Sequence, residues 1–189
     1  MLRSFLILIL LAVTASASAK EFDYNFFQLS YGNIEFDDVN VDGDGFGLAG
    51  SYSINPDFHV FAGYEAAGLD FGIDATSLGA GIGWHTTLSP VVDLVASVSY
   101  QYVELDAPGG ANADDNGLGL GVGLRFAASD VLELNAGISY VDFSDSGDDT
   151  GFGIGGLYSF TEAFSLGLSA DWSDDATSYT LAGRFYFGE

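Results

Sequence analysis

The sequence predicts an all-β protein, a single antiparallel up-and-down β-barrel of about ten strands, with eight strands as the alternative. Three observations predict it. Apolar and polar residues alternate with a period of two along most of the chain. Short turn signals separate the alternating segments. Most segments are longer than the roughly 5–6 residues of an ordinary soluble strand.

The first nineteen residues predict a secretory signal rather than part of the fold. Arg3 gives a basic start, Phe5–Val13 is an apolar run, and Ala17–Ala19 offers a small-x-small cleavage site before Lys20. The apolar run is shorter than the roughly 20 residues of a transmembrane helix. We therefore expect a signal peptide over 1–19 and one β-barrel domain over 20–189.

Composition and charge exclude several classes of protein. The 189 residues include 27 acidic and four basic side chains, with a net charge of −23, which excludes a nucleic-acid-binding surface. The chain has no Cys, so no disulfide framework holds it. Nevertheless 48% of the residues are hydrophobic, so acidic and apolar residues must be segregated along the chain.

The alternation defines the expected strands. In the segment 132–140, Leu132, Leu134, Ala136, Ile138 and Tyr140 share one face, with polar or small residues between them. The same reasoning predicts strands at 24–36, 45–54, 58–69, 75–88, 92–105, 116–127, 131–142, 150–160, 164–173 and 177–187.

Three of these strands alternate Gly with a large apolar residue, over 79–84, 117–124 and 151–155. The glycine-rich fingerprint of dinucleotide-binding proteins needs its third Gly three residues after its second, at the start of a helix. Here successive glycines are two residues apart, so they mark one face of a strand rather than a nucleotide site.

The ends of the apolar face distinguish a membrane barrel from a soluble sandwich. A membrane barrel carries aromatic belts around an outward-facing aliphatic band, and strands of about 10–13 residues are long enough to cross a bilayer. One predicted belt lies near the short turns and contains Phe58, Trp84, Phe126, Phe160, Phe164 and Phe187. The other lies near longer acidic loops and contains Tyr64, Tyr100, Tyr140, Phe152, Trp172 and Tyr179. The two belts favour a transmembrane β-barrel over an ordinary soluble core.

The end of the chain adds a resemblance. The pattern Thr180-x-Ala182-x-x-Phe185-x-Phe187 resembles the C-terminal signature of Gram-negative outer-membrane barrels, although Ala182 replaces the usual Gly and Gly188-Glu189 follow. Over 20–189 the chain resembles small porin-like barrels of the OmpA and OmpX type. This resemblance implies location in the cell outer membrane, contact with lipid and lipopolysaccharide, and recognition by the barrel assembly machinery through Phe185 and Phe187. It also places the acidic loops outside the cell and the short turns in the periplasm.

The first acidic loop contains half of a calcium-binding pattern. Asp38, Asn40, Asp42 and Asp44 have the spacing of an EF-hand loop, but Ala49 occupies the position of its bidentate Glu. A solvated loop that binds Ca²⁺ or Mg²⁺ only weakly is the expectation, with no dedicated metal site and no cofactor. Its companion loops are expected at 70–74, 106–115, 142–149 and 174–175.

Few charged residues fall on the predicted inner face. If the turn centres on Ser129, Arg125 and Glu133 stand opposite one another as an ion pair that locks register or selects solutes. We expect Arg184 to face Gly167 and to reach across the lumen to Glu65. His59 and His85 are also predicted to be inward neighbours, but no Ser or carboxylate is placed beside them by a recognisable motif, so catalysis is not expected.

Two functions remain open at this point. A narrow porin-like passive channel is favoured by the Gly-lined strands, because missing side chains leave space in the lumen. The alternative is a non-conducting structural or surface-interaction barrel with acidic extracellular loops, because small barrels usually have filled interiors and glycines also permit strong curvature.

Overall fold

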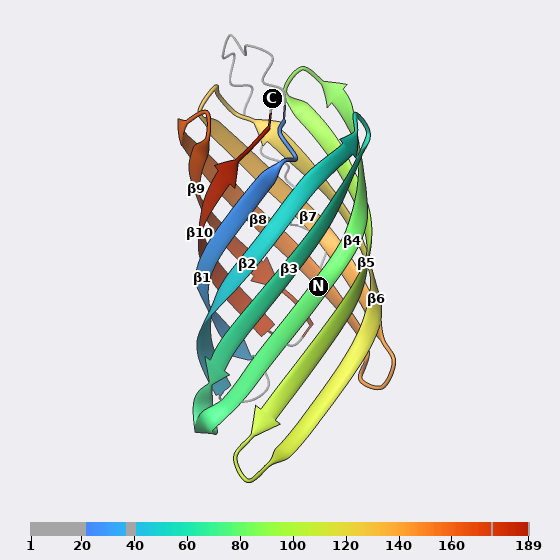
Figure 1. Cartoon of the computed structure of the whole chain (residues 1–189), viewed down its shortest axis with the longest axis vertical. Coiled ribbons are helices and arrows are strands. Elements are labelled where there is room, and N and C mark those ends of the chain that lie inside the picture. The colour runs from blue at the N-terminus through green and yellow to red at the C-terminus, as the bar shows by residue number, and fades with distance from the viewer. Residues whose placement is uncertain (1–21, 37–40, 175, 189) are drawn as a thin grey trace, which may run out of the picture.

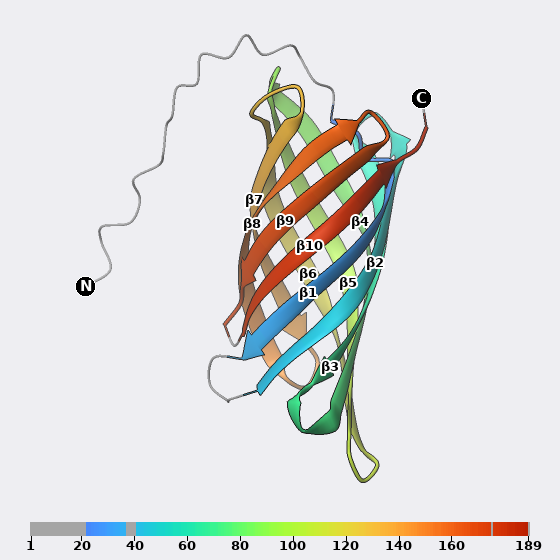
Figure 2. The same cartoon turned by 90° about the vertical axis from the view of Figure 1, so that its left-hand side faces the viewer.

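The computed structural model describes residues 22–36, 41–174 and 176–188. They form one closed antiparallel barrel in which each strand pairs with its neighbours in sequence and β1 pairs with β10 (Figures 1 and 2). The prediction of ten strands is confirmed, and the eight-strand alternative is wrong. No helix in the described residues is long and apolar enough to cross a membrane. The strands are β1 (Phe26–Phe36), β2 (Val41–Asn55), β3 (Phe58–Leu69), β4 (Ile73–Ser89), β5 (Val92–Ala107), β6 (Ala111–Ala127), β7 (Leu132–Phe143), β8 (Gly147–Thr161), β9 (Phe164–Trp172) and β10 (Ala176–Tyr186).

The period of two sorts the side chains onto the two faces of the wall. On β6, Leu118 and Leu120 are 63% and 58% exposed on the outside, while the alternating Gly119 and Gly121 face the lumen. Large apolar side chains on the outside and small or polar ones inside are the reverse of a soluble core. The fold therefore confirms the facing expected from the sequence.

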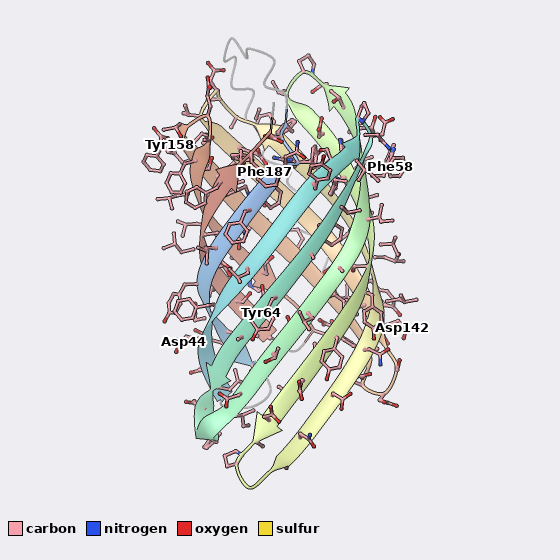
Figure 3. All side chains as sticks on the ribbon, viewed as in Figure 1. Asp44, Phe58, Tyr64, Asp142, Tyr158 and Phe187 are labelled. Atoms are coloured by element: carbon pink, nitrogen blue, oxygen red, sulfur yellow. The ribbon has the colours of Figure 1, made fainter. Side chains whose placement is uncertain are left out.

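The predicted aromatic belts also lie on the outside. All twelve rings are exposed except that of Phe164, which is partly buried against the Phe185 ring at 4.8 Å. Figure 3 shows Phe58, Tyr158 and Phe187 near one end of the barrel and Tyr64 farther toward the other. We call the first end, which holds the turns 56–57, 90–91, 128–131 and 162–163, the turn end, and the opposite end the acidic end.

Strands are longer at the acidic end than the sequence suggested. The segments 106–115 and 142–149, expected as loops, are largely strand, because β5 and β6 continue to Ala107 and Ala111 and β8 begins at Gly147. In an antiparallel hairpin each further pair of residues satisfies its own backbone groups, even where the side chains are acidic. Gly109 and Gly110 close the β5–β6 turn with positive φ angles of 93° and 83°, which other residues rarely adopt. This hairpin projects farthest in Figures 1 and 2.

The inward glycines do not simply leave open space. A Cβ atom at Gly81 would lie 2.6 Å from Cζ of Phe61, and the His59 ring occupies the space above Gly83. These glycines allow side chains from the neighbouring strand to lie flat across the wall. The width of the lumen is therefore set by particular side chains rather than by the number of glycines.

Candidate functional site

The lumen contains a succession of cavities. A central cavity of about 620 Å³ is lined by residues of most strands and by Tyr24. A turn-end cavity of about 500 Å³ shares Arg125 and Glu133 with it, and an acidic-end cavity of about 420 Å³ shares Glu65 with it. The three cavities thus follow one another along the barrel, with charged side chains where each meets the next.

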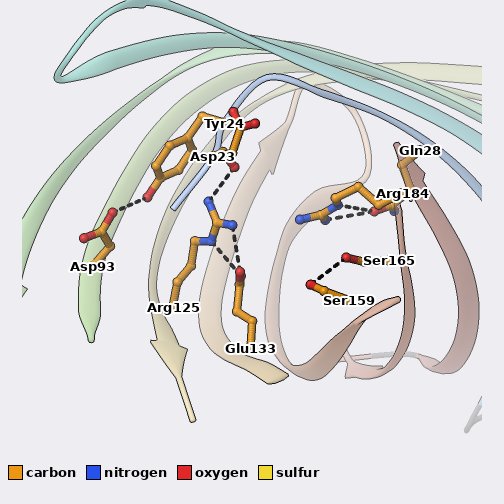
Figure 4. Close-up of polar contacts among 9 residues, drawn as sticks. All are labelled: Asp23, Tyr24, Gln28, Asp93, Arg125, Glu133, Ser159, Ser165 and Arg184. Atoms are coloured by element: carbon orange, nitrogen blue, oxygen red, sulfur yellow. Dashed lines mark hydrogen bonds and ion pairs between the residues drawn. The ribbon is translucent and has the colours of Figure 1, made fainter. Parts of the chain in front are cut away.

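Arg125 and Glu133 form a buried ion pair between the central and turn-end cavities (Figure 4). The Nε and Nη2 groups of Arg125 donate to the two carboxylate oxygens of Glu133 at 2.7 and 3.0 Å, a two-point geometry that suits a planar guanidinium. Arg125 is 9% exposed and Glu133 is 3% exposed. The predicted pair is present, but the two residues are diagonal rather than directly opposite. Arg125 pairs with Asn135 in the β6–β7 register, because the turn spans four residues from Ala128.

The segment Phe22–Asn25, which precedes β1, lies against this ion pair. Arg125 Nη1 donates to the carbonyl oxygen of Asp23 at 3.2 Å, and its guanidinium carbon lies 4.5 Å from the centre of the Tyr24 ring. The Tyr24 hydroxyl donates to Asp93 Oδ2 at 3.0 Å. We call Phe22–Asn25 the N-terminal segment. It occupies part of the lumen at the turn end and narrows the opening there.

His59 and His85 complete the wall around Tyr24. The Tyr24 ring stacks on His85 with centroids 3.7 Å apart and on His59 at 4.8 Å. The two histidine Nδ1 atoms are 3.1 Å apart, so one of them carries the hydrogen and the other accepts it. The histidines are therefore inward neighbours, as expected, and each is engaged in packing and hydrogen bonding. Within the described residues no group of three His, Cys, Asp or Glu side chains is arranged to hold a metal ion.

Arg184 lines the central cavity but does not reach Glu65. Its Nε and Nη2 groups donate to Gln28 Oε1 at 3.0 and 2.8 Å, and its guanidinium carbon lies 4.0 Å above the Phe26 ring. The expected ion pair between Arg184 and Glu65 does not form. Among the described residues, Arg125–Glu133 is the only ion pair. Arg184 faces Ser165 rather than Gly167, because the β9–β10 turn closes with the Ser173 N–H bonded to the Ala176 carbonyl.

The residues predicted to bind divalent cations are dispersed or outside the described part of the chain. Asp38 and Asn40 lie outside the described residues. Asp42 and Asp44 lie on the outer face of β2 rather than in a turn, and Asp44 accepts a hydrogen bond from the Tyr31 hydroxyl at 2.9 Å. Divalent binding by these residues stays a prediction.

Sequence reasoning missed the N-terminal segment and Asp93. The alternation predicts Tyr24 as part of the first strand, which begins only at Phe26. A signal was present, because Phe22, Tyr24, Phe26 and Gln28 continue the inward period of β1. Aromatic rings on an inward face next to lumenal arginines indicate packing inside the barrel.

Comparisons with known proteins agree with this architecture. A family model described as "Outer membrane protein beta-barrel domain" matches residues 4–160, well over half of the chain. No curated protein matches the chain.

Several solved structures are similar in fold. The β domain of the Bordetella autotransporter Brka has 13% identity and a TM-score of 0.51, with 86% of this chain and 99% of that chain covered. The translocator domain of the autotransporter NalP from Neisseria meningitidis has 10% identity and a TM-score of 0.50, with 89% of this chain and 91% of that chain covered. The KdgM porin has 12% identity and a TM-score of 0.49, with 85% of this chain and 99% of that chain covered. At these identities the likeness to the two autotransporter domains shows the barrel fold alone.

Proposed function

The chain belongs to the family of outer membrane protein β-barrel domains, and from this premise we propose that it is a narrow passive channel across the outer membrane. The protein lies in that membrane and its outer face contacts lipid. In the proposed orientation the turn end lies in the periplasm and the acidic end outside the cell. A signal peptide over residues 1–19 would direct the export that this location requires.

The succession of cavities is the observation that carries the proposal. A barrel filled by side chains would leave no such space, whereas here three cavities of about 500, 620 and 420 Å³ follow one another and neighbouring cavities share lining residues. Arg125 and Glu133 line both the central and the turn-end cavities, Tyr24 lies against Arg125, and Arg184 and Glu65 line the central cavity. These residues are the proposed constriction and lumen lining of the channel.

The same residues favour the second candidate, a non-conducting barrel. The N-terminal segment and the Arg125–Glu133 pair together fill much of the turn end. If they close it fully, the acidic hairpins outside the cell become the functional surface, as an interaction site.

Single-channel conductance of the refolded protein in planar bilayers distinguishes the two candidates. We expect discrete steps, larger in Tyr24→Ala because this change removes the ring from the turn end. Tyr52→Ala is the matched control, because the Tyr52 ring is exposed on the outer face. Silent bilayers for both the wild type and Tyr24→Ala, with folding confirmed by a heat-dependent gel shift, would overturn the channel and leave the interaction barrel.

The end of β10 supports recognition by the barrel assembly machinery. Phe185 and Phe187 are both exposed on the outer face at the turn end, where a partner can reach them. Replacing both by Ala should reduce the amount of folded protein in the outer membrane of cells. The double variant Phe58→Ala with Phe160→Ala removes two exposed rings of the same belt and should assemble normally. Equal losses in the two double variants would count against a specific terminal signal.

Like-charge pairs at the acidic end support weak binding of Ca²⁺ or Mg²⁺ there. Asp74 pairs with Asp106, and Asp142 with Asp148, directly across neighbouring strands. Such pairs are destabilising by roughly 0.2–1 kcal/mol each, and hard cations would relieve the repulsion and bridge to lipopolysaccharide. Mg²⁺ should therefore raise the unfolding midpoint of the wild type more than that of an Asp106→Asn and Asp142→Asn variant. An equal rise in both would argue against binding at the acidic end.

Neither catalysis nor a cofactor is part of the proposal. The similar structures are named as a porin and as domains of autotransporters, not as enzymes.

A further inference from the structure

The central cavity contains one cation and one anion that lack oppositely charged partners among the described residues. Arg125 and Glu133 neutralise each other. Arg184 is bonded to the uncharged Gln28, and no carboxylate of the described residues lies within ion-pair distance of it. Glu65 points into the same cavity and makes neither an ion pair nor a hydrogen bond with the residues that the structure describes. The cavity therefore has one guanidinium and one carboxylate to offer to a solute.

These two charges lie apart along the channel. Through the register, Arg184 is aligned with Gln28 on β1, Ala49 on β2 and Gly63 on β3, and Glu65 is two residues farther toward the acidic end. The two positions are separated around the wall by three strand spacings of about 4.8 Å each. Both residues line the central cavity, so a solute held there is exposed to both charges.

The surroundings set the order in which an entering solute meets these charges. Asp171 joins Glu65 in the acidic-end cavity, so an anion that enters from outside meets two carboxylates. Arg184 carries the unpaired positive charge of the central cavity, so a cation that has passed Glu65 then meets a guanidinium group. A solute of either net charge is disfavoured at one end of the central cavity. A solute that carries both charges is favoured at both.

We propose that the central cavity binds small zwitterions of the size of a free α-amino acid, with the carboxylate on Arg184 and the ammonium on Glu65. This inference rests on the proposed channel function and names its solute class. Guanidinium suits carboxylate because its N–H groups bind two oxygens at once, and Gln28 leaves further donors available. A volume of about 620 Å³ falls within the usual range of small-molecule sites. Phe26 and Phe61 line the cavity and offer apolar surface to the amino-acid side chain.

Binding to the full mature protein refolded in detergent tests the inference, with four probes of one side chain. Leucine carries both charges, N-acetylleucine only the carboxylate, leucinamide only the ammonium, and N-acetylleucinamide neither. In calorimetric titrations we expect leucine to bind at least about tenfold more tightly than each blocked probe, which corresponds to loss of one charged contact.

Variants assign each contact to its residue. Glu65→Gln should make leucine and N-acetylleucine bind equally, and Arg184→Gln should make leucine and leucinamide bind equally, while Arg184→Lys should restore part of the preference. Glu35→Gln is the matched control, because Glu35 faces outward on β1, and it should bind as the wild type does. Folding of every variant is checked by the heat-dependent gel shift.

The outcomes separate this inference from the channel itself. If the four probes bind alike, or if leucine binds unchanged in both Glu65→Gln and Arg184→Gln, the zwitterion site is overturned. If no probe binds while the bilayers show discrete steps, the channel stands and the solute class is wrong. If leucine binds through both residues but the bilayers are silent, the site stands and the channel is wrong.

Discussion

At the scale of single residues, Arg125 connects three parts of the chain. It pairs with Glu133 on β7, donates to the carbonyl of Asp23 and lies over the Tyr24 ring. Removing two charges from water costs several kcal/mol per ion, which a buried pair recovers only with good geometry and further hydrogen bonds. Arg125 and Glu133 meet that condition, and each therefore depends strongly on the presence of the other.

Glu133→Gln should destabilise the barrel by about 3 kcal/mol, because the buried guanidinium loses its counter-charge. Urea unfolding in detergent, followed by tryptophan fluorescence, measures the change. Glu162→Gln, a substitution at an exposed turn-end residue, should leave the unfolding midpoint unchanged. A midpoint for Glu133→Gln that equals that of Glu162→Gln would show that water in the lumen solvates Arg125 fully.

The sequence allowed the lumenal charges to be identified but not their exact partners. The face of the wall on which a side chain lies follows from the period of two. The alternation by itself therefore places four charged residues on the inner face: Arg125, Glu133, Arg184 and Glu65. Partner choice depends on where each turn is centred, and moving that centre by one residue moves the neighbour across the strand pair by two positions. Arg184 meets Gln28 rather than Glu65 because the seam between β1 and β10 closes with Arg184 and Gln28 directly opposite each other.

At the scale of elements, the β7–β8 hairpin is held by a carboxylate on a neighbouring strand. Asp115 of β6 accepts hydrogen bonds from the Ser146 hydroxyl at 2.6 Å, from the Ser146 N–H at 2.7 Å and from the Asp145 N–H. Asp115 lies beyond Leu118 toward the acidic end, outside the lipid-facing band. These hydrogen bonds, chiefly that of Ser146, favour the ionised form and hold the pKa of Asp115 below its ordinary value.

The hairpin should therefore loosen in acid. The pKa of Asp115 is lower in the closed hairpin than in the open one. The ionised carboxylate therefore stabilises the closed hairpin fully above the ordinary aspartate pKa, and this stabilisation is lost as the pH falls through the lowered pKa. Amide hydrogen exchange at Ser146, corrected for intrinsic rates, should show protection at neutral pH that declines below about pH 4. Asp115→Asn should be poorly protected throughout. If the Ser146 amide of Asp115→Asn is protected as strongly as that of the wild type at neutral pH, Asp115 does not hold the hairpin closed.

Strand positions were largely predictable, whereas strand ends were not. The predicted range 58–69 matches β3, because turn residues bound it on both sides. In contrast, β6 begins at Ala111 rather than 116, since Asp114 and Asp115 indicate a loop by composition but are held in a ladder by pairing with Glu104 and Val103. Tertiary pairing overrides local preference at such positions.

At the scale of the whole molecule, the barrel depends on an apolar solvent around its middle. Leu120 and Leu168 lie on the outer face of β6 and β9, in the aliphatic band between the two belts. Water would penalise these exposed side chains, and lipid would favour them. The stability of the fold is therefore a property of the protein together with its membrane.

Leu120→Arg or Leu168→Arg should each cost about 2–4 kcal/mol in a bilayer, because a charge is placed near the middle of the hydrocarbon. Leu88→Arg is the control, since Leu88 adjoins the turn at Pro90, and near the interface the cost should fall to about 0–1 kcal/mol. Reversible unfolding from lipid vesicles measures all three. Equal costs for the three variants would contradict the depth assigned to the band.

The N-terminal segment inside the lumen also has a consequence for the order of assembly. Tyr24 meets Asp93 across 69 positions of the chain, Asp23 meets Arg125 across 102, and Gln28 meets Arg184 across 156. As the chain emerges into the periplasm during export, the partners of the segment therefore become available before β10 does. Contacts with β5 and β6 can hold the beginning of β1 in place while the sheet is still open, and the seam with β10 then closes around a first strand that is already positioned.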